Sequence, residues 1–317
     1  MALAIYEPAV NRLKNEMTSL TSMTPRSQRV PGQLIRVGDV HVRVNVTGEG
    51  PPLLLVHGLG APLDLWAPLV KELEGYTVIT LDNPGAGAST VPWPAWFMPK
   101  YAETLDAVLE ELGFDKVDVL GLSFGGMICQ EFAFRYPQRI RRLILAGTTA
   151  GVGVTFGNPL ALTVLATPLR YYSRTYMAMT APFLYGGDAD GGSELVAEQT
   201  DLRHKMRPSI PGYFAQLATA STFSSFWYLP SIRIPTMVLA GAEDPITNPL
   251  TCWVIAKRIP KSKYREVKGG GHLFLMEKPA VSAEYIREFL EAEPRTGSEG
   301  EGDGESKTAR RRISRSA

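Results

Sequence analysis

The sequence predicts an α/β protein whose mostly parallel sheet of about eight strands has helices on both faces. Short, continuously apolar runs alternate with longer segments of helical periodicity, which is the pattern of a parallel sheet buried on both faces. An alternating stretch before the first run adds an antiparallel hairpin. One long interruption of the repeat predicts a helical insert.

The strands follow one another along the chain at regular intervals. The hairpin consists of "GQLIRV" and "VHVRVNV", which alternate around Gly38-Asp39. The buried strands that follow are "PPLLLVHG", "YTVITLD", "VDVLGLS", "RRLILAG", "PTMVLAG" and the run "KYREVKGGG" before His272. Together they make about eight strands, a number that suits one large α/β domain.

The chain divides into five parts by composition and pattern. Residues between the fourth and fifth buried strands are helical and rich in aromatic side chains, whereas the C-terminal end is polar and rich in Gly and Ser, a composition typical of disorder. We expect an N-terminal extension at 1–30, a first core part at 31–148, a helical lid at 149–230, a second core part at 231–291 and a disordered tail at 292–317.

Bulk composition excludes several classes of protein. The 317 residues are 44% hydrophobic and 21% charged with a net charge of +1, so nucleic acid is not the expected partner. Two cysteines, Cys129 and Cys252, cannot form a disulfide framework and fit a reducing compartment. No signal-peptide pattern and no long apolar run is visible, so we expect a cytoplasmic protein without a transmembrane segment.

Ser123 is the first candidate for chemistry. In open α/β sheets the functional site lies at the carboxyl ends of the strands. Ser123 stands in "GLSFGG", directly after the strand "VDVL" and before a long helical pattern. Small neighbours allow the sharp turn that exposes a nucleophilic hydroxyl above the sheet. The alternative is a glycine-rich turn in which the serine only caps the helix.

A serine hydroxyl needs a base to take its proton. Of the four histidines, His272 follows three glycines after the last strand and is the predicted general base, although a purely structural histidine is the alternative. His57 precedes a Gly-x-Gly turn and is predicted to brace that loop. His41 lies in the hairpin and His204 in the insert.

The base needs a carboxylate that orients it. Asp244 in "VLAGAEDPITNP" lies just past a strand and is the predicted partner of His272. Glu243 is the second choice for this role. The alternative for Asp244 is that its side chain only caps the following helix. The order serine, aspartate, histidine is the one found where a serine occupies a strand-to-helix elbow. The backbone N–H groups of Phe124 and Leu59 are the predicted oxyanion hole.

No cofactor is expected. The glycines after Asp82 in "DNPGAGAST" lack the phosphate-loop pattern, so this stretch is predicted to be a structural loop beside the site. No cluster of histidines, cysteines or carboxylates has the spacing of metal ligands, so no metal is predicted either.

These motifs resemble the α/β-hydrolase superfamily. The matching stretches are HGLG, DNPGAGAS, GLSFGG, GAEDP and GGGHLFLMEKP, spread over residues 33–290. A narrower set, including "ATPLRYYSR", "APFLYGG" and "GYFAQLATAS" in the insert, is similar to the intracellular medium-chain poly(3-hydroxyalkanoate) depolymerases. The resemblance implies an α/β-hydrolase fold, a triad of Ser123, Asp244 and His272, and cleavage of esters in polymer held in intracellular granules.

Two departures keep other ester substrates open. Phe124 stands where that family is associated with tryptophan, and His57-Gly58 stands where it is associated with asparagine-glycine. A general carboxylesterase or lipase and a lactone hydrolase are therefore alternatives. A C–C bond hydrolase of ring-fission products is another, but no arginine is evidently placed for its carboxylate. The last alternative is a non-catalytic receptor on the same fold.

The aromatic and flexible apolar residues of the insert suggest an acyl or polyester pocket. The residues predicted to bind substrate are Phe156, Leu160, Tyr172, Met177, Phe183, Phe214 and Trp227. The alternative for each of them is that it builds the insert's own core. The expected partner is a hydrophobic ester or polyester, whereas granule association and oligomeric state stay open.

Overall fold

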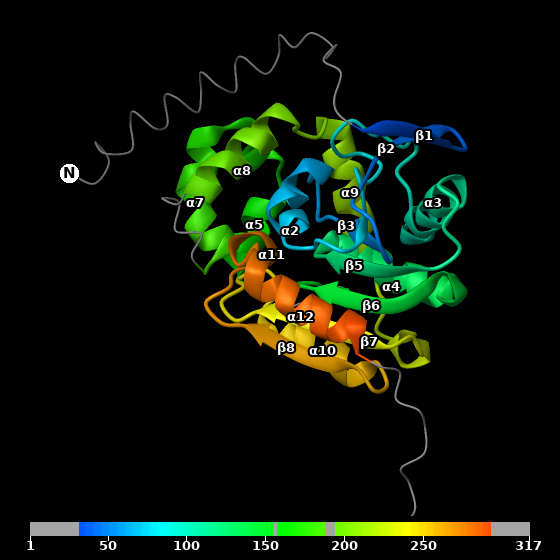
Figure 1. Cartoon of the computed structure of the whole chain (residues 1–317). Coiled ribbons are helices and arrows are strands. Elements are labelled where there is room, and N and C mark those ends of the chain that lie inside the picture. The colour runs from blue at the N-terminus through cyan, green and yellow to red at the C-terminus, as the bar shows by residue number, and fades with distance from the viewer. Residues whose placement is uncertain (1–31, 152, 155–156, 188–193, 293–317) are drawn as a thin grey trace, which may run out of the picture.

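A computed structural model of the chain describes residues 32–151, 153–154, 157–187 and 194–292 (Figure 1). The expected N-terminal extension, the tail beyond residue 292 and the candidate Phe156 lie outside these residues.

The described residues form one eight-stranded sheet in the order β1-β2-β4-β3-β5-β6-β7-β8. Strands β3 to β8 run parallel, whereas β1 and β2 form the predicted hairpin and β2 pairs antiparallel with β4. The predicted fold is therefore confirmed. The strands are β1 Gln33–Val37, β2 Val40–Thr47, β3 Pro52–Val56, β4 Thr77–Leu81, β5 Val117–Leu122, β6 Ile140–Ala146, β7 Thr236–Gly241 and β8 Lys263–Val267.

The two faces of the sheet are both apolar, as the unbroken hydrophobic runs require. Along β3, Leu54 and Val56 join one hydrophobic core, whereas Leu53 and Leu55 join the other. Successive side chains of a strand point to opposite faces, so a strand buried on both sides cannot alternate with polar residues.

Helices cover both faces (Figure 1). Residues of α3, α4 and α10 belong to the first core, and residues of α2, α11 and α12 belong to the second. Their bounds are α2 Ala67–Lys71, α3 Met98–Glu111, α4 Phe124–Arg135, α10 Pro249–Arg258, α11 Phe274–Glu277 and α12 Pro279–Glu291. Short 3-10 helices are η2 Leu63–Trp66, η3 Pro137–Arg139 and η4 Leu229–Ser231.

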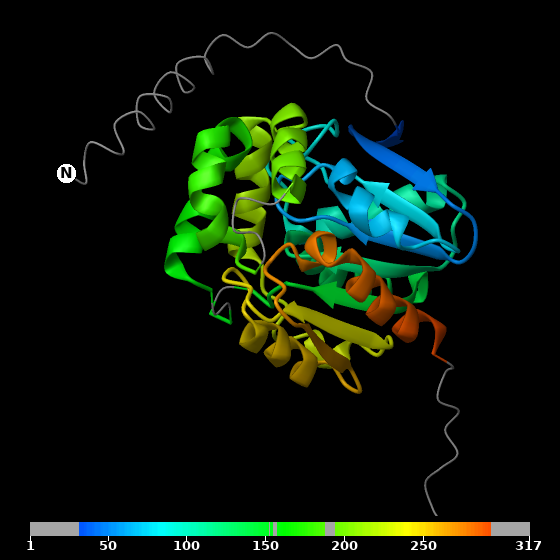
Figure 2. The same ribbon diagram turned by 60° about the vertical axis from the view of Figure 1, so that its left-hand side comes forward.

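Between β6 and β7 the described residues form helices, which we call the helical insert (residues 159–222). It contains α5 Pro159–Leu165, α6 Leu169–Tyr172, α7 Arg174–Tyr185, α8 Glu194–Lys205 and α9 Ile210–Thr222. The side chains of Asn158, Ser173 and Ser209 cap α5, α7 and α9 by accepting backbone N–H groups. Figures 1 and 2 show the insert beside the end of the sheet toward which the parallel strands point.

Candidate active site

Ser123 lies on a strained turn between β5 and α4. Its backbone has φ 55° and ψ −119°, a region that non-glycine residues rarely occupy. Two hydrogen bonds stabilise the turn. The Ser123 N–H donates to Ala146 O at 2.9 Å, and Thr148 Oγ1 donates to Ser123 O at 2.7 Å. Such strain at a predicted nucleophile matches the elbow that the sequence motif indicates.

The two glycines of the motif allow the chain to pass closely at this turn. A Cβ atom on Gly121 would lie 2.5 Å from Gly125 O, and a Cβ atom on Gly125 would collide with Val56 O. Side chains at either position would force β5, α4 and the end of β3 apart. The pattern G-x-S-x-G is thus explained by backbone packing around Ser123.

His272 and Asp244 form a buried pair. The distance between His272 Nδ1 and Asp244 Oδ2 is 2.8 Å, and the Asp244 side chain is 2% exposed. Asp244 Oδ1 accepts the N–H groups of Ile246 and Thr247 at 2.8 and 3.0 Å, and Thr247 Oγ1 donates to Oδ2 at 2.8 Å. Because a carboxylate only accepts, Nδ1 of a neutral His272 carries the proton and Nε2 is the unprotonated ring nitrogen.

Of the two candidate carboxylates, Asp244 and not Glu243 contacts His272. Glu243 is exposed, whereas Asp244 is buried against His272. The His272 N–H donates to Tyr185 O of the helical insert at 2.6 Å, which fixes the loop that carries the imidazole.

Ser123 and His272 line the same small cavity, of about 40 Å³. Leu59 and His57 from the loop after β3 line it too, as do residues of the helical insert. The described residues that line it are His57, Gly58, Leu59, Ala61, Leu122, Ser123, Leu165, Arg170, Tyr171, Tyr185, Arg203, Ile246, His272 and Leu273. Residues of the helical insert therefore form part of the cavity wall.

The predicted oxyanion donors come from the residue after Ser123 and from the cavity wall. Phe124 is the first residue of α4, so its N–H has no acceptor within the helix. A Cβ atom on Gly58 would lie 3.3 Å from Ser123 Cβ, which shows how closely the loop before Leu59 approaches the elbow. The assignment of the Leu59 and Phe124 N–H groups to an oxyanion stays a prediction.

The residues predicted to bind substrate do not line this cavity where the structure describes them. Tyr172 and Met177 are buried within the molecule. Leu160, Phe183, Phe214 and Trp227 are among the exposed large hydrophobic side chains. Contact with a substrate stays a prediction for these residues, and it would have to occur outside the cavity.

His57 braces its loop. Its Nδ1 accepts the Gly58 N–H at 2.7 Å, its carbonyl oxygen accepts Asn83 Nδ2 at 2.9 Å, and its ring lies 4.5 Å from that of Trp66. Burial, with smaller contributions from Arg203 and His272, holds the pKa of His57 well below its usual 6.5. His57 is thus a neutral side chain in the cavity wall.

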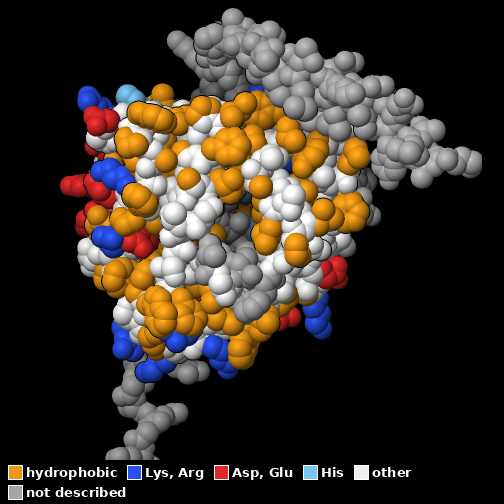
Figure 3. All heavy atoms as spheres, turned by 180° about the vertical axis from the view of Figure 1, so that it is seen from behind, with side chains coloured by type: hydrophobic (Ala, Val, Ile, Leu, Met, Phe, Trp, Pro, Cys, Tyr) orange, Lys and Arg blue, Asp and Glu red, His pale blue; other side chains and the backbone are white. Residues whose placement is uncertain are grey.

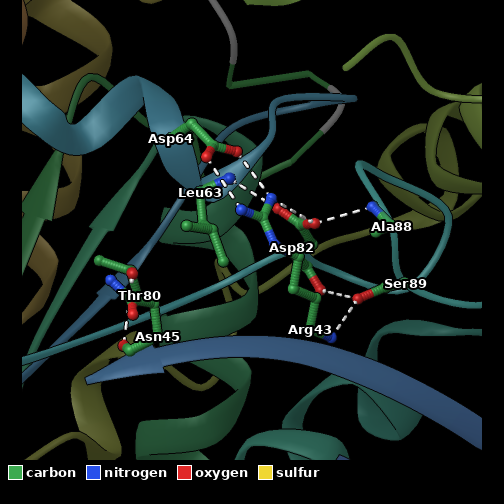
Figure 4. A network of polar contacts seen from close by, with 8 residues as sticks. All are labelled: Arg43, Asn45, Leu63, Asp64, Thr80, Asp82, Ala88 and Ser89. Atoms are coloured by element: carbon green, nitrogen blue, oxygen red, sulfur yellow. Dashed lines mark hydrogen bonds and ion pairs between the residues drawn. The ribbon is translucent and has the colours of Figure 1, made fainter. Parts of the chain in front are cut away.

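Asp82 organises the neighbouring loop (Figure 4). Its carboxylate accepts the N–H groups of Leu63 and Ala88 at 2.6 and 2.8 Å, and it lies 3.4 Å from Arg43 Nη1. Arg43 in turn contacts both oxygens of Asp64 at 2.7 and 2.9 Å. These contacts join β2, β4 and η2. They agree with the structural role predicted for the loop that begins at Asp82.

Sequence reasoning missed two arginines in the cavity wall. Arg170 and Arg203 come from α6 and α8 and are 4% and 2% exposed. The expectation that no arginine is placed for a substrate carboxylate therefore needs correction. The sequence contains only a weak signal for their position, because the helical insert carries several other basic residues and no pattern distinguishes Arg170 and Arg203 from them.

The fold and the relatives of this chain define a hydrolase. Residues 51–178 and 195–279 match the family model of the alpha/beta hydrolase fold, so the chain belongs to the α/β-hydrolase family. Within it, the chain is similar to the poly(3-hydroxyalkanoate) depolymerase of Ectopseudomonas oleovorans. The two are 35% identical over 76% of this chain and 85% of that protein.

Other relatives have different activities. The 2-hydroxy-6-oxo-2,4-heptadienoate hydrolase of Pseudomonas putida is 29% identical over 83% of this chain and 97% of its own length. A thermophilic esterase structure from Thermogutta terrifontis has a TM-score of 0.68 and 28% identity over 84% of this chain and 98% of its own. The family thus establishes a hydrolase without identifying the substrate.

The described residues contain neither a membrane-spanning helix nor a cluster of metal ligands. No helix there is both long and apolar enough to span a bilayer. Within the same ranges, no three or more histidine, cysteine or acidic side chains are grouped as metal ligands would be.

Proposed function

We propose that the protein is a serine carboxylic-ester hydrolase that acts on hydrophobic esters, and specifically a poly(3-hydroxyalkanoate) depolymerase. The observation that carries the proposal is the shared cavity of Ser123 and His272, with Asp244 2.8 Å behind the imidazole. This arrangement supplies a nucleophile, a base and an orienting carboxylate in one place.

The reaction follows from these roles. His272 Nε2 removes the Ser123 hydroxyl proton while Oγ attacks the ester carbonyl carbon. The Leu59 and Phe124 N–H groups stabilise the oxyanion. The C–O bond then breaks, and the leaving alkoxide takes the proton from His272. A water molecule, deprotonated by His272, attacks the acyl-enzyme and releases the carboxylic acid and free Ser123.

A polymeric substrate is supported by the relative and by the molecular surface. The relative of 35% identity is a poly(3-hydroxyalkanoate) depolymerase. Hydrophobic side chains are spread over the face seen in Figure 3, around a central hollow. Trp227 is 81% exposed, and Phe183 and Phe214 are about half exposed, so aromatic surface is available to a polyester. Cytoplasmic location at polymer granules belongs to the same proposal.

Acid release from amorphous medium-chain polyhydroxyalkanoate granules, followed by pH-stat, tests this function. Wild-type protein should release acid and the Ser123→Ala variant should not. Release from a small octanoate ester but not from granules would keep the serine hydrolase and reject the depolymerase. Equal activity of Ser123→Ala on every ester would reject the mechanism.

Arg170 and Arg203 favour a second candidate, a C–C bond hydrolase of acidic diketones. These arginines line the cavity, and the Pseudomonas putida relative is named for a carboxylate-bearing substrate. Parallel turnover of a vinylogous diketone acid and of a simple ester distinguishes the two reactions.

A further inference from the structure

The cavity beside Ser123 contains more positive charge than the ester mechanism uses. Arg170 and Arg203 both line it and are almost fully buried. Neutral ester chemistry needs the serine, the histidine and two N–H donors. Burying two guanidinium groups costs free energy unless something of opposite charge compensates them.

The partners of Arg170 are neutral. Its Nη1 donates to Tyr213 Oη at 2.5 Å and its Nη2 to Leu59 O at 3.4 Å. The guanidinium also lies over the rings of Tyr171 and Tyr213, at 4.7 and 5.1 Å from their centres. Ring faces and carbonyls hold the group in place but do not neutralise it.

Among the described residues, Arg203 has even fewer partners than Arg170. Its Nη1 donates to Gln199 Oε1 at 3.0 Å, and its guanidinium lies 5.4 Å from the centre of the Tyr185 ring. A guanidinium has five N–H donors, so most of those on Arg203 are unused by these contacts. In the described part of the chain, no carboxylate forms an ion pair with Arg203 or with Arg170.

The wall of the cavity contains a further donor. His57 Nδ1 accepts the Gly58 N–H, so the proton of the neutral ring is on Nε2. His57 Nε2 is buried and finds no acceptor among the described residues. Among the described residues, no aspartate or glutamate lines the cavity. The cavity therefore offers two cations and a spare N–H group, a set that an anion would complement.

We propose that Arg170 and Arg203 bind a carboxylate of the substrate, so that the preferred substrates are esters with a free acid at the alcohol end. The inference rests on the proposed ester hydrolase function. In an oligomer of a 3-hydroxy acid, the terminal carboxylate carbon lies two carbons from the carbon that bears the ester oxygen. The scissile ester and the acid are thus close enough to share one small cavity.

This arrangement specifies where a polyester is cut. An internal ester bond of the polymer has no charge near it, whereas the last bond at the carboxyl terminus has one. Binding of that terminus to the arginines orients the last ester bond over Ser123. Hydrolysis there adds one water molecule and releases a single 3-hydroxy acid, leaving a new terminal carboxylate on the shortened chain.

The test uses two soluble dimers of 3-hydroxyoctanoic acid, one with a free carboxylate and one capped as its methyl ester. The kcat/KM for the internal ester bond is measured for both with wild-type protein and with Arg203→Met. Wild-type protein should prefer the free acid, and Arg203→Met should lose about 10- to 100-fold on the acid but less than about threefold on the capped dimer.

Two further variants serve as controls. Arg174→Met removes an insert arginine that is 55% exposed, pairs with Asp201 and lies outside the cavity lining, so it should keep the preference. Arg203→Lys keeps the positive charge and should retain part of the preference for the free acid. Octanoate and its uncharged analogue octanamide are also compared as competitive inhibitors. Inhibition by octanoate should weaken in Arg203→Met but not in Arg174→Met, whereas inhibition by octanamide should not change. A folding defect would weaken binding of both inhibitors, so this readout separates the two explanations.

Equal kcat/KM for the two dimers with wild-type protein would overturn the carboxylate site while leaving the ester hydrolase intact. An equal loss on both dimers in Arg203→Met would also overturn it, since the arginine would then be structural. If wild-type protein cleaved neither of the dimers and also failed to cleave the simple octanoate ester, the proposed function itself would be rejected.

Discussion

The hydroxyl of Tyr171 donates a hydrogen bond of 2.6 Å to the carbonyl oxygen of Leu59. Gln216 Oε1 accepts the N–H of Gly60 at 2.8 Å. Side chains of the helical insert therefore hold both sides of the peptide unit between Leu59 and Gly60. The N–H of Leu59, the proposed oxyanion donor, belongs to the preceding peptide unit, so the insert sets the position of that donor.

Removing the Tyr171 hydroxyl should impair the oxyanion hole without removing it. We expect Tyr171→Phe to lower kcat for a small ester by about tenfold with little change in KM, because the loss is felt in the transition state. Steady-state kinetics on an octanoate ester measures both constants. Tyr76→Phe is the matched control, since the Tyr76 hydroxyl donates to Glu291 Oε1 at 3.0 Å and Tyr76 does not line the cavity. An unchanged kcat in Tyr171→Phe would contradict the coupling.

Asp244 should be essential and Glu243 dispensable. Asp244→Asn replaces an acceptor that holds His272 Nδ1 at 2.8 Å, so the imidazole adopts the wrong tautomer and kcat should fall by about 10⁴. Glu243→Gln changes an exposed neighbour and should stay within about twofold of wild type. Ester turnover by the purified variants measures both effects. A comparable loss in Glu243→Gln would reassign the carboxylate.

His57 should make the folded state sensitive to acid. Burial, aided by Arg203 and His272, lowers its pKa in the folded protein, whereas the unfolded chain binds a proton near pH 6.5. The unfolded state therefore binds more protons below pH 6.5, and the free energy of unfolding should fall there by up to about 1.4 kcal/mol per pH unit from this group.

Urea unfolding of wild type and of His57→Asn between pH 7 and pH 5 measures this contribution. The variant should show a shallower fall in the free energy of unfolding with decreasing pH. His41→Asn, at an exposed histidine, should keep the wild-type slope. Parallel curves for wild type and His57→Asn would show that His57 is not the responsible group.

Arg43 should stabilise the fold through Asp82. Arg43 is 2% exposed and contacts both Asp64 and Asp82, and burial raises the pKa of Asp82 to about 6 despite these contacts. Arg43→Met leaves a buried carboxylate uncompensated at neutral pH and should lower the free energy of unfolding by about 3–5 kcal/mol. Arg36→Met, on the exposed side of β1, should change it by less than about 0.5 kcal/mol. Equal values for the two variants in urea unfolding would refute the network's role.

The sequence by itself determined the sheet and indicated the candidate residues at the ends of its strands. Apolar runs such as "PPLLLVHG" predict buried parallel strands because both faces of each strand need apolar side chains. The residues at the strand ends, Ser123, Asp244 and His272, follow from the strand positions, since parallel strands end at one edge of the sheet. The glycines around Ser123 reveal a tight turn because only small residues fit there.

Only the tertiary structure decided what surrounds those residues. Leu59 and Tyr171 are 112 residues apart in the chain, and their contact depends on how the insert packs on the core. Helical periodicity shows that a face is apolar but not which cavity it borders. Leu160 and Phe214, which their residue type predicts to bind substrate, are exposed and do not line the cavity. Arg170 and Arg203 are buried because several elements enclose them at once, and no local pattern encodes that arrangement.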